Sequence, residues 1–226
     1  MTSPVPHDLN LALSDAVLAI SAARDLDGVL QMIADQARAL GAARYAAVGV
    51  PSPDGRRLER FVTSGLTPDE VERIATAPRG QGLLGVMLRE GRPLSVPDIS
   101  ADPRAAGVPP HHPQMRTLLG VPIKRGDEVL GQLYVADKVG GAPFTAADEE
   151  VLDLLSRHAA LAIAGTRLME RLTESEARYR MLTQGAPEIL FSLDADGRIA
   201  FVNERTRAVT GFEPAIILGR RLRDLV

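Results

Sequence analysis

Apolar positions recur at helical spacing over the first forty residues and then switch to strand-like spacing. Residues 9–40 predict a pair of helices, with Asp27 as the N-cap of the second and Gly41 at its end. Short helices are predicted at Thr67–Ala75 and Gly82–Glu90. Shorter apolar segments predict strands at Arg44–Val50, Leu58–Thr63, Leu94–Val96, Thr117–Lys124 and Glu128–Asp137. This order predicts an α+β fold in which helices flank a central antiparallel sheet.

A long helical pattern follows the last of these strands. It begins at Phe144–Asp148 and runs towards Thr183. Its apolar positions recur about every 3.5 residues, as in a two-stranded coiled coil. They are Val151, Leu155, Ala162, Met169, Leu172 and Tyr179. The pattern predicts a parallel homodimer with Met169, Leu172 and Tyr179 near the two-fold axis. The alternative is a single helix packed on its own sheet.

The pattern changes again beyond Gly185. Strands are predicted at Glu188–Leu193 and Arg198–Asn203, and short helices at Glu204–Thr210 and Pro214–Leu218. Because about forty residues with two strands cannot bury a full core, we expect this region to be only part of a domain. The predicted organisation is a first domain over 1–168, a connecting helix over 169–183 and a partial domain over 184–226.

Composition narrows the range of functions. The chain has 226 residues, a net charge of −3, no cysteine and only 4% aromatic residues. The weak charge argues against a nucleic-acid partner, and the missing cysteines exclude thiol catalysis and thioether-linked cofactors. No apolar run is long enough to span a bilayer, and no secretory signal begins the sequence, so we expect a cytoplasmic protein. No nucleophile with an orienting base stands out, so we expect no enzyme activity.

Several motifs of the first region resemble those of a GAF domain. They are Arg79–Gly85, Gly91–Leu94, Val96–Asp98, Leu119–Ile123 and Leu130–Tyr134. The resemblance extends over roughly residues 9–168. It implies a sensory module of a signal-transduction protein.

Residues 177–226 resemble the first half of a PAS domain. The similar segments include Phe191–Asp194, Gly197–Ile199, Val202–Asn203 and Thr210–Phe212. A GAF domain followed by a PAS domain resembles the input region of bacterial two-component sensor histidine kinases and of cyclic-dinucleotide enzymes. The resemblance implies that an output enzyme belongs to the parent protein.

Two further motifs favour structural interpretations. Asp137-Lys138, Phe144 and Asp148 resemble the NKxnFxxxDE signature of cyclic-nucleotide GAF domains, with Asp137 in place of asparagine. Lys138 is expected to pair with Asp148 and to clasp the end of a strand to the start of the long helix. Gly80–Gly85 satisfies GxGxxG, but a helical pattern precedes it where a dinucleotide site needs a strand. We therefore expect a tight turn there.

The segment from His111 to Thr117 contains the strongest candidates for ligand-binding side chains. Successive side chains of an extended segment alternate, so His111 and His112 cannot both enter one pocket. Pro113 favours extended geometry at His112, and a neutral imidazole is a good axial ligand for haem iron. The alternative is a loop histidine that only packs or hydrogen-bonds within the loop.

The same stretch resembles the haem-bearing GAF domain of actinobacterial dormancy-sensor histidine kinases. The resemblance implies that His112 is the proximal iron ligand and that Tyr134 lies on the distal side. It implies a non-covalent haem that senses a diatomic gas (O2, NO or CO) or a redox state. Two alternatives stay open, a GAF domain that binds another small ligand such as a nucleotide and a ligand-free module for dimerisation and relay.

Overall fold

The computed structural model describes residues 25–52, 58–74, 82–105 and 111–224. The chain forms two compact units, Met1–Arg167 and Leu168–Val226. The predicted first helix, which begins near residue 9, lies outside the described residues, and so does the first part of the GxGxxG motif.

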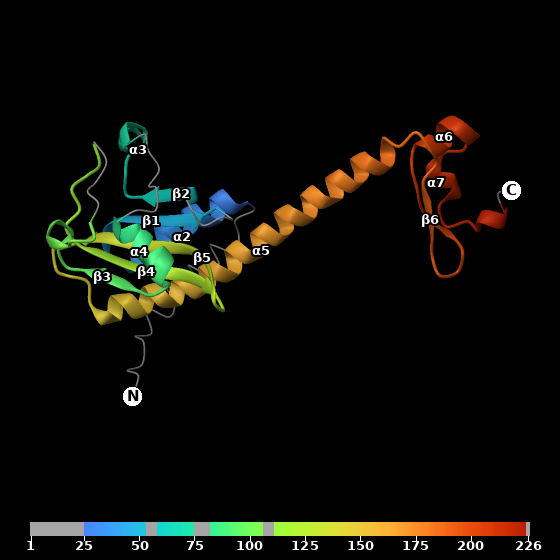
Figure 1. The fold of residues 1–226 in the computed structure, drawn as a ribbon. Helices are drawn as coiled ribbons and strands as arrows, with labels where there is room; N and C mark the ends of the chain where they lie inside the picture. Colours follow the sequence, from blue (N-terminus) through green and yellow to red (C-terminus); the bar gives the residue numbers. More distant parts are fainter. Residues whose placement is uncertain (1–24, 53–57, 75–81, 106–110, 225–226) are drawn as a thin grey trace. The chain divides into compact units, whose positions relative to one another are not determined.

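The first unit is built on a five-stranded sheet with the strand order β2-β1-β5-β4-β3 (Figure 1). Every pair of neighbouring strands is antiparallel. The strands are β1 (Ala43–Pro51), β2 (Leu58–Ser64), β3 (Leu94–Val96), β4 (Leu118–Arg125) and β5 (Glu128–Lys138). The predicted α+β class with a central antiparallel sheet is therefore confirmed.

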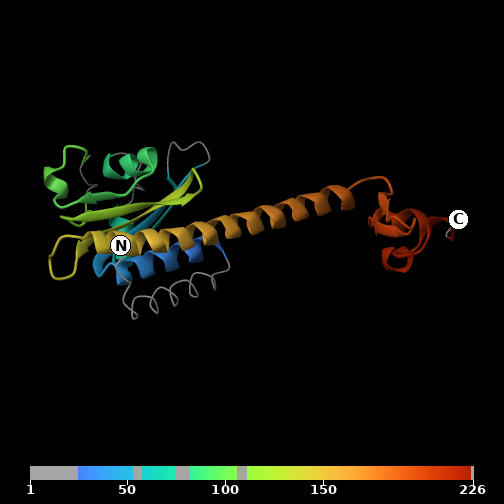
Figure 2. The same cartoon turned by 90° about the horizontal axis from the view of Figure 1, so that it is seen from below.

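Helices α2 (Leu26–Leu40) and α5 (Ala146–Gln184) cover one face of this sheet (Figure 2). The apolar side chains between them form the larger core of the unit. Its fully buried members include Ile33, Leu133 and Ile163. Large aliphatic side chains at helical and alternating spacing account for this packing.

The N-cap of α2 differs from the prediction. Asp25, rather than Asp27, has extended backbone geometry, and its Oδ1 accepts a hydrogen bond of 2.7 Å from the Gly28 amide. Asp27 lies in the first helical turn, where its charge suits the helix dipole. The prediction of Asp27 as the cap was wrong because two aspartates stand two residues apart and both precede the apolar stripe.

The opposite face of the sheet carries α4 (Gly82–Glu90) (Figure 2). Helix α3 (Pro68–Ile74) follows β2 and has no buried residues. Ile99 of the short 3-10 helix η1 (Ile99–Ala101) and Ala105 border the apolar cluster on this face. Its buried members are Ala47, Leu83, Met87, Leu94, Val96, Leu118 and Tyr134. This cluster is smaller than the one beneath α2 and α5.

Helix α5 is continuous over 39 residues, but its apolar positions have two environments. Leu152, Leu155, Ala159 and Ile163 are buried in the core of the first unit. Leu155 therefore packs on its own sheet and does not belong to an exposed stripe. The large apolar side chains that follow Arg167 on α5 are exposed. They are Leu168, Met169, Leu172, Tyr179, Met181 and Leu182.

The second unit contains a two-stranded antiparallel sheet of β6 (Phe191–Leu193) and β7 (Ile199–Val202). Helices α6 (Arg205–Thr210) and α7 (Pro214–Ile217) and the 3-10 helix η2 (Leu222–Asp224) follow. The buried Asn203 side chain donates to the carbonyl oxygens of Thr183 and Glu188 at 2.8 and 2.9 Å. Asn203 thus joins the end of α5 to the segment that leads into β6.

Candidate functional site

The sheet face beneath α4 combines small residues with two polar ones. Strand pairing places Ala47, Tyr134 and Gly120 in one row, and Gly49 and Gln132 in the next. Paired residues point to the same side of a sheet, and so do residues two apart on one strand. Because Ala47 and Tyr134 belong to the cluster under α4, Gln132 faces the same side.

Met87 of α4 is fully buried against this face. A methyl group added at Gly120 would overlap the Met87 sulfur, so the missing side chain at Gly120 is what admits the methionine. A methionine side chain is unbranched and adapts readily to a change in its surroundings. The contact between α4 and the sheet at this point therefore depends on one flexible side chain.

Tyr134 is 8% exposed, and its neighbours Leu133 and Val135 pack on the opposite side of the sheet. Its ring centroid lies 6.3 Å from that of Phe61. Burial raises the pKa of the Tyr134 hydroxyl above its ordinary value. The hydroxyl stays neutral at physiological pH and remains available as a hydrogen-bond donor.

Gln132 is fully buried, and neither its Oε1 nor its Nε2 has a hydrogen-bond partner among the described residues. Its Nε2 lies 3.2 Å from the position that a side-chain carbon at Gly49 would occupy. A buried polar group without a partner costs about 1–3 kcal/mol of folding free energy. Sequence reasoning missed this residue, although a glutamine inside the apolar run of β5 was a usable signal.

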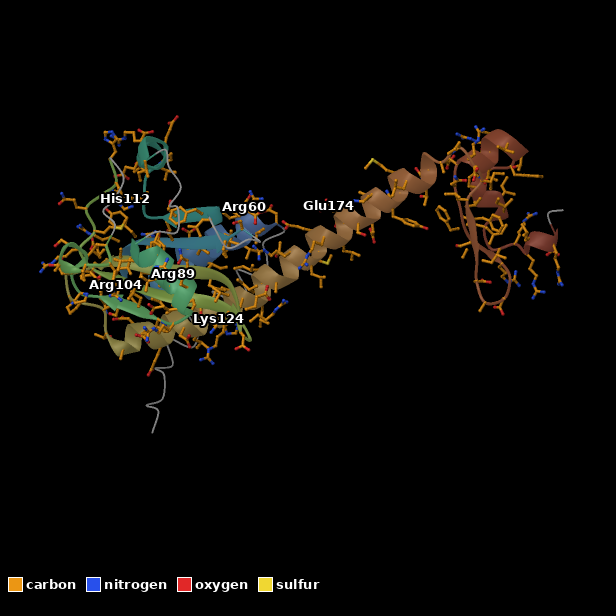
Figure 3. All side chains as sticks on the ribbon, viewed as in Figure 1. Arg60, Arg89, Arg104, His112, Lys124 and Glu174 are labelled. Atoms are coloured by element: carbon orange, nitrogen blue, oxygen red, sulfur yellow. The ribbon has the colours of Figure 1, made fainter. Side chains whose placement is uncertain are left out.

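His112 lies in the loop that leads into β4 (Figure 3). Its ring Nδ1 is 2.8 Å from the carbonyl oxygen of Pro113. Since a carbonyl oxygen only accepts, Nδ1 is the donor of this hydrogen bond, and in the tautomer that carries only this proton Nε2 is the acceptor nitrogen. His111 is exposed and has a positive φ of 66°. The two adjacent histidines therefore have different environments.

Asp137 connects this loop to the end of β5. Its Oδ1 accepts hydrogen bonds from the Arg116 and Thr117 amides at 2.8 and 3.0 Å. Asp137 has a positive φ of 55°, a conformation that asparagine and aspartate tolerate better than most residues. The aspartate that replaces the asparagine of the signature thus serves as an acceptor for two backbone donors.

Lys138 and Asp148 are in direct contact. The Lys138 Nζ donates to both Asp148 carboxylate oxygens at 2.7 and 2.6 Å. Asp148 Oδ2 also accepts from the Thr145 amide and hydroxyl at 2.7 and 2.8 Å, at the start of α5. Burial favours the neutral acid, but the hydrogen bonds from Lys138 and Thr145 outweigh it and hold the Asp148 pKa below its ordinary value. The pair fastens the end of β5 to the first turn of α5.

Of the residues singled out in the sequence, Lys138 and Asp148 meet directly. His112 and Tyr134 lie on separate elements, and no hydrogen bond joins them within the described residues. His112 stands in the loop before β4, whereas Tyr134 stands in the middle of β5. Across the described ranges, no three histidine or acidic side chains converge into a group that could hold a metal ion.

A family comparison decides the identity of the first unit. Residues 23–164, more than half of the chain, match the model of the GAF domain. The chain belongs to the GAF domain family. The matched residues include every described helix and strand from α2 to β5 and the first part of α5.

Solved structures agree with this fold. The GAF domain of a phosphoenolpyruvate-protein phosphotransferase from Coxiella burnetii matches with a TM-score of 0.63 and 21% identity, over 72% of this chain and 96% of that chain. The second GAF domain of DevS from Mycobacterium smegmatis matches with a TM-score of 0.51 and 25% identity, over 66% and 99%. The GAF domain of a candidate sensor histidine kinase from Pseudomonas syringae pv. tomato matches with a TM-score of 0.51 and 17% identity, over 74% and 93%.

Two further observations concern the predicted GxGxxG turn and the possibility of a membrane-spanning helix. Helix α4 begins at Gly82, which has a positive φ of 62°, and the described element before it is the helix α3. A dinucleotide site of the GxGxxG type would need a strand in that place. In the described part of the chain, no helix is both long enough and apolar enough to cross a membrane.

Proposed function

We propose that this chain is the cytoplasmic input region of a bacterial signalling protein, and that its GAF domain binds haem non-covalently to sense a diatomic gas or a redox state. The bound haem would supply an iron that takes O2, NO or CO. His112 would hold the iron, and Tyr134 would offer its hydroxyl on the other side. The output enzyme would be a histidine kinase or a cyclic-dinucleotide enzyme elsewhere in the parent protein.

The observation that carries this proposal is the hydrogen bond of His112. Metal-binding histidines usually donate their second ring nitrogen to a carbonyl or carboxylate, which fixes the tautomer and the ring direction. The Nδ1 of His112 has such a partner in the Pro113 carbonyl oxygen, and Nε2 is left as the ligating atom. Because the sequence has no cysteine, a thioether attachment of the haem is excluded.

The face beneath α4 suits a flat apolar group with a polar centre. Small residues at Ala47, Gly49 and Gly120 line its central strands. The flexible Met87 is the side chain that would have to move, and it lies where no Cβ obstructs it. Tyr134 would offer its hydroxyl as a hydrogen-bond donor from the sheet.

The contacts of the loop give a route from His112 to α5. The loop is tied to β5 by the two hydrogen bonds of Asp137, and β5 is tied to α5 by Lys138 and Asp148. A shift of His112 would therefore strain a connected set of hydrogen bonds that ends at the first turn of α5. The effect on the output can only equal the difference in ligand affinity between the two states. Residues 184–226 would form the N-terminal half of a PAS domain on this route.

Adding haemin to the purified full-length chain tests the haem proposal. The wild type should give a Soret absorption band at one haem per chain, and His112→Ala should abolish it. His111→Ala is the matched control, because the neighbouring histidine is exposed, and it should bind normally. A wild type without a Soret band, or stoichiometric haem binding by His112→Ala, would overturn the proposal.

We also propose that the chain is a parallel homodimer through the second half of α5. Met169, Leu172 and Tyr179 are all exposed, and so are Leu161 and Leu168. Leu172 follows Met169 by three residues and Tyr179 follows Leu172 by seven, which is the spacing of an a position and two successive d positions of a coiled coil. Exposed apolar area costs about 25 cal/mol per Å2, so a second copy would stabilise this face by covering it.

The double variant Met169→Glu and Leu172→Glu tests this dimer. Glutamates at the seam would bring like charges together, so light scattering should report a dimer for the wild type and a monomer for the variant. Glu170→Gln and Arg171→Gln, on the same turn, form a control that removes charges and leaves the apolar positions in place. A wild-type monomer at tens of micromolar, or an unchanged dimer in the glutamate variant, would contradict this seam.

A further inference from the structure

Gln132 does not fit the chemistry of its surroundings. It stands in the middle of β5 beside Leu133, its side chain has no exposed area, and both polar atoms of its amide lack a partner among the described residues. Buried side-chain polar atoms in proteins nearly always have a hydrogen-bond partner. Departures from the packing rules are expected mainly at functional or strained sites.

The Gln132 side chain lies on the same side of the sheet as the Tyr134 side chain. The two residues are two positions apart on β5, so both side chains leave the same face of the sheet. Gln132 pairs with Gly49, and Tyr134 pairs with Ala47 on the same neighbouring strand. The Gln132 Nε2 lies 3.2 Å from the position that a Cβ at Gly49 would occupy, so a larger residue there would require the amide to shift. Small neighbours therefore leave room for an amide that has no hydrogen-bond partner in the described part of the chain.

We propose that Gln132 is a second hydrogen-bond donor for the ligand, beside the hydroxyl of Tyr134, and that it helps to set which diatomic gas the domain prefers. This inference rests on the haem-binding function proposed above. The Gln132 amide is neutral at every physiological pH and donates through Nε2. A donor favours a polar ligand over an apolar one, so two donors on this face favour O2 over CO.

The first test uses the full-length chain without haem. In Gln132→Met an apolar side chain of similar length replaces the amide. The melting temperature of the GAF unit should rise by about 2–4 °C, because an unpartnered buried amide is removed. A fall in melting temperature would show that Gln132 holds the sheet together and would overturn the inference.

The second test uses the same chain loaded with haemin and reduced. Relative to the wild type, Gln132→Met should shift the C–O stretch of the CO complex to higher frequency and raise the O2 dissociation rate about tenfold, the equivalent of one hydrogen bond. Thr206→Val is the control, because it removes a different unpartnered buried polar group, the Thr206 hydroxyl of the second unit. This control should leave the C–O stretch and the O2 dissociation rate unchanged.

The two possible failures look different. If the wild type gives a Soret band but Gln132→Met leaves the C–O stretch and the O2 rate unchanged, the role of Gln132 is overturned and the haem function stands. If the wild type gives no Soret band, the haem function fails, and the role of Gln132 towards a diatomic gas fails with it.

Discussion

Successive residues of β5 enter two different environments. Leu133 points to the face beneath α2 and α5, where Ile163 and other large aliphatic side chains are fully buried. Gln132 and Tyr134 point to the face beneath α4, where Gly120 leaves room for a methionine. One face has the composition of a close-packed core, and the other combines small residues with polar groups. Under the proposed function, alternate positions of this strand would serve stability and ligand recognition separately.

The largest expected effect comes from the close-packed face. Leu133→Ala removes a fully buried side chain from the larger core and should lower the free energy of unfolding by about 2–5 kcal/mol. Chemical denaturation of the full-length chain measures this. A loss below about 1 kcal/mol would mean that this face is not close-packed, and the contrast between the two faces would disappear.

Removing the hydrogen bonds that join the His112 loop to β5 should have the next largest effect on the free energy of unfolding. Asp137→Ala removes the acceptor of two backbone donors and puts alanine at a positive φ, at a cost of about 2 kcal/mol. Asp137→Asn keeps an acceptor and tolerates the same backbone, so it should lose less than about 0.5 kcal/mol. Equal losses in the two variants would show that the charge of Asp137, rather than its geometry, is what matters.

The Lys138–Asp148 pair should give a smaller effect that depends on pH. The Asp148 pKa is lowered from its ordinary value of 3.8, so its contribution is complete above that value and is lost as the pH falls through the lowered pKa. Asp148→Asn should cost about 1 kcal/mol at neutral pH, since the pair is partly exposed. It should also weaken the acid dependence of unfolding, because the variant has no carboxylate to titrate at this position.

A matched control for this pair is Glu128→Gln, which breaks an exposed ion pair with Arg125. Exposed pairs contribute little, so Glu128→Gln should leave the unfolding free energy nearly unchanged at neutral pH. Denaturation curves between pH 2 and pH 7 compare the three proteins. Parallel curves for the wild type and Asp148→Asn would contradict a lowered Asp148 pKa.

The smallest effect on stability is expected from a substitution on the face beneath α4. Tyr134→Phe removes one hydroxyl with little change in volume and should alter the unfolding free energy by less than about 0.5 kcal/mol. Under the proposed function, the same change should alter discrimination among O2, CO and NO without loss of haem. Denaturation and gas titration together measure both effects. A loss of more than 1 kcal/mol would assign the hydroxyl a structural role.

The sequence predicts the sheet and its helices well because each element follows one dominant period. The alternation along β5 separates Leu133 and Val135 from Tyr134, and the helical period identifies α5. The N-cap at Asp25 was missed because two nearby aspartates carry the same local signal. Helix caps depend on the backbone angles of one residue, which a pattern of side chains does not specify.

The candidate site is less predictable than the fold. That Gln132 lacks a partner depends on every side chain around it, and these come from strands distant in sequence. The hydrogen bond of His112 depends on the local loop conformation. Spacing between motifs can suggest that His112 and Tyr134 belong together, but the path of the loop decides how they face each other.

The order of the strands affects when the sheet face beneath α4 can form during synthesis. The central pairing of β1 with β5 joins Val48 to Leu133, and 133 − 48 = 85 residues separate them. Closing so long a loop is slow compared with forming the hairpin of β1 and β2. A chain emerging from the ribosome therefore presents Ala47 and Gly49 well before Tyr134 is synthesised. The face beneath α4 is therefore complete only after β5, the last strand of the sheet to be synthesised, has inserted between β1 and β4.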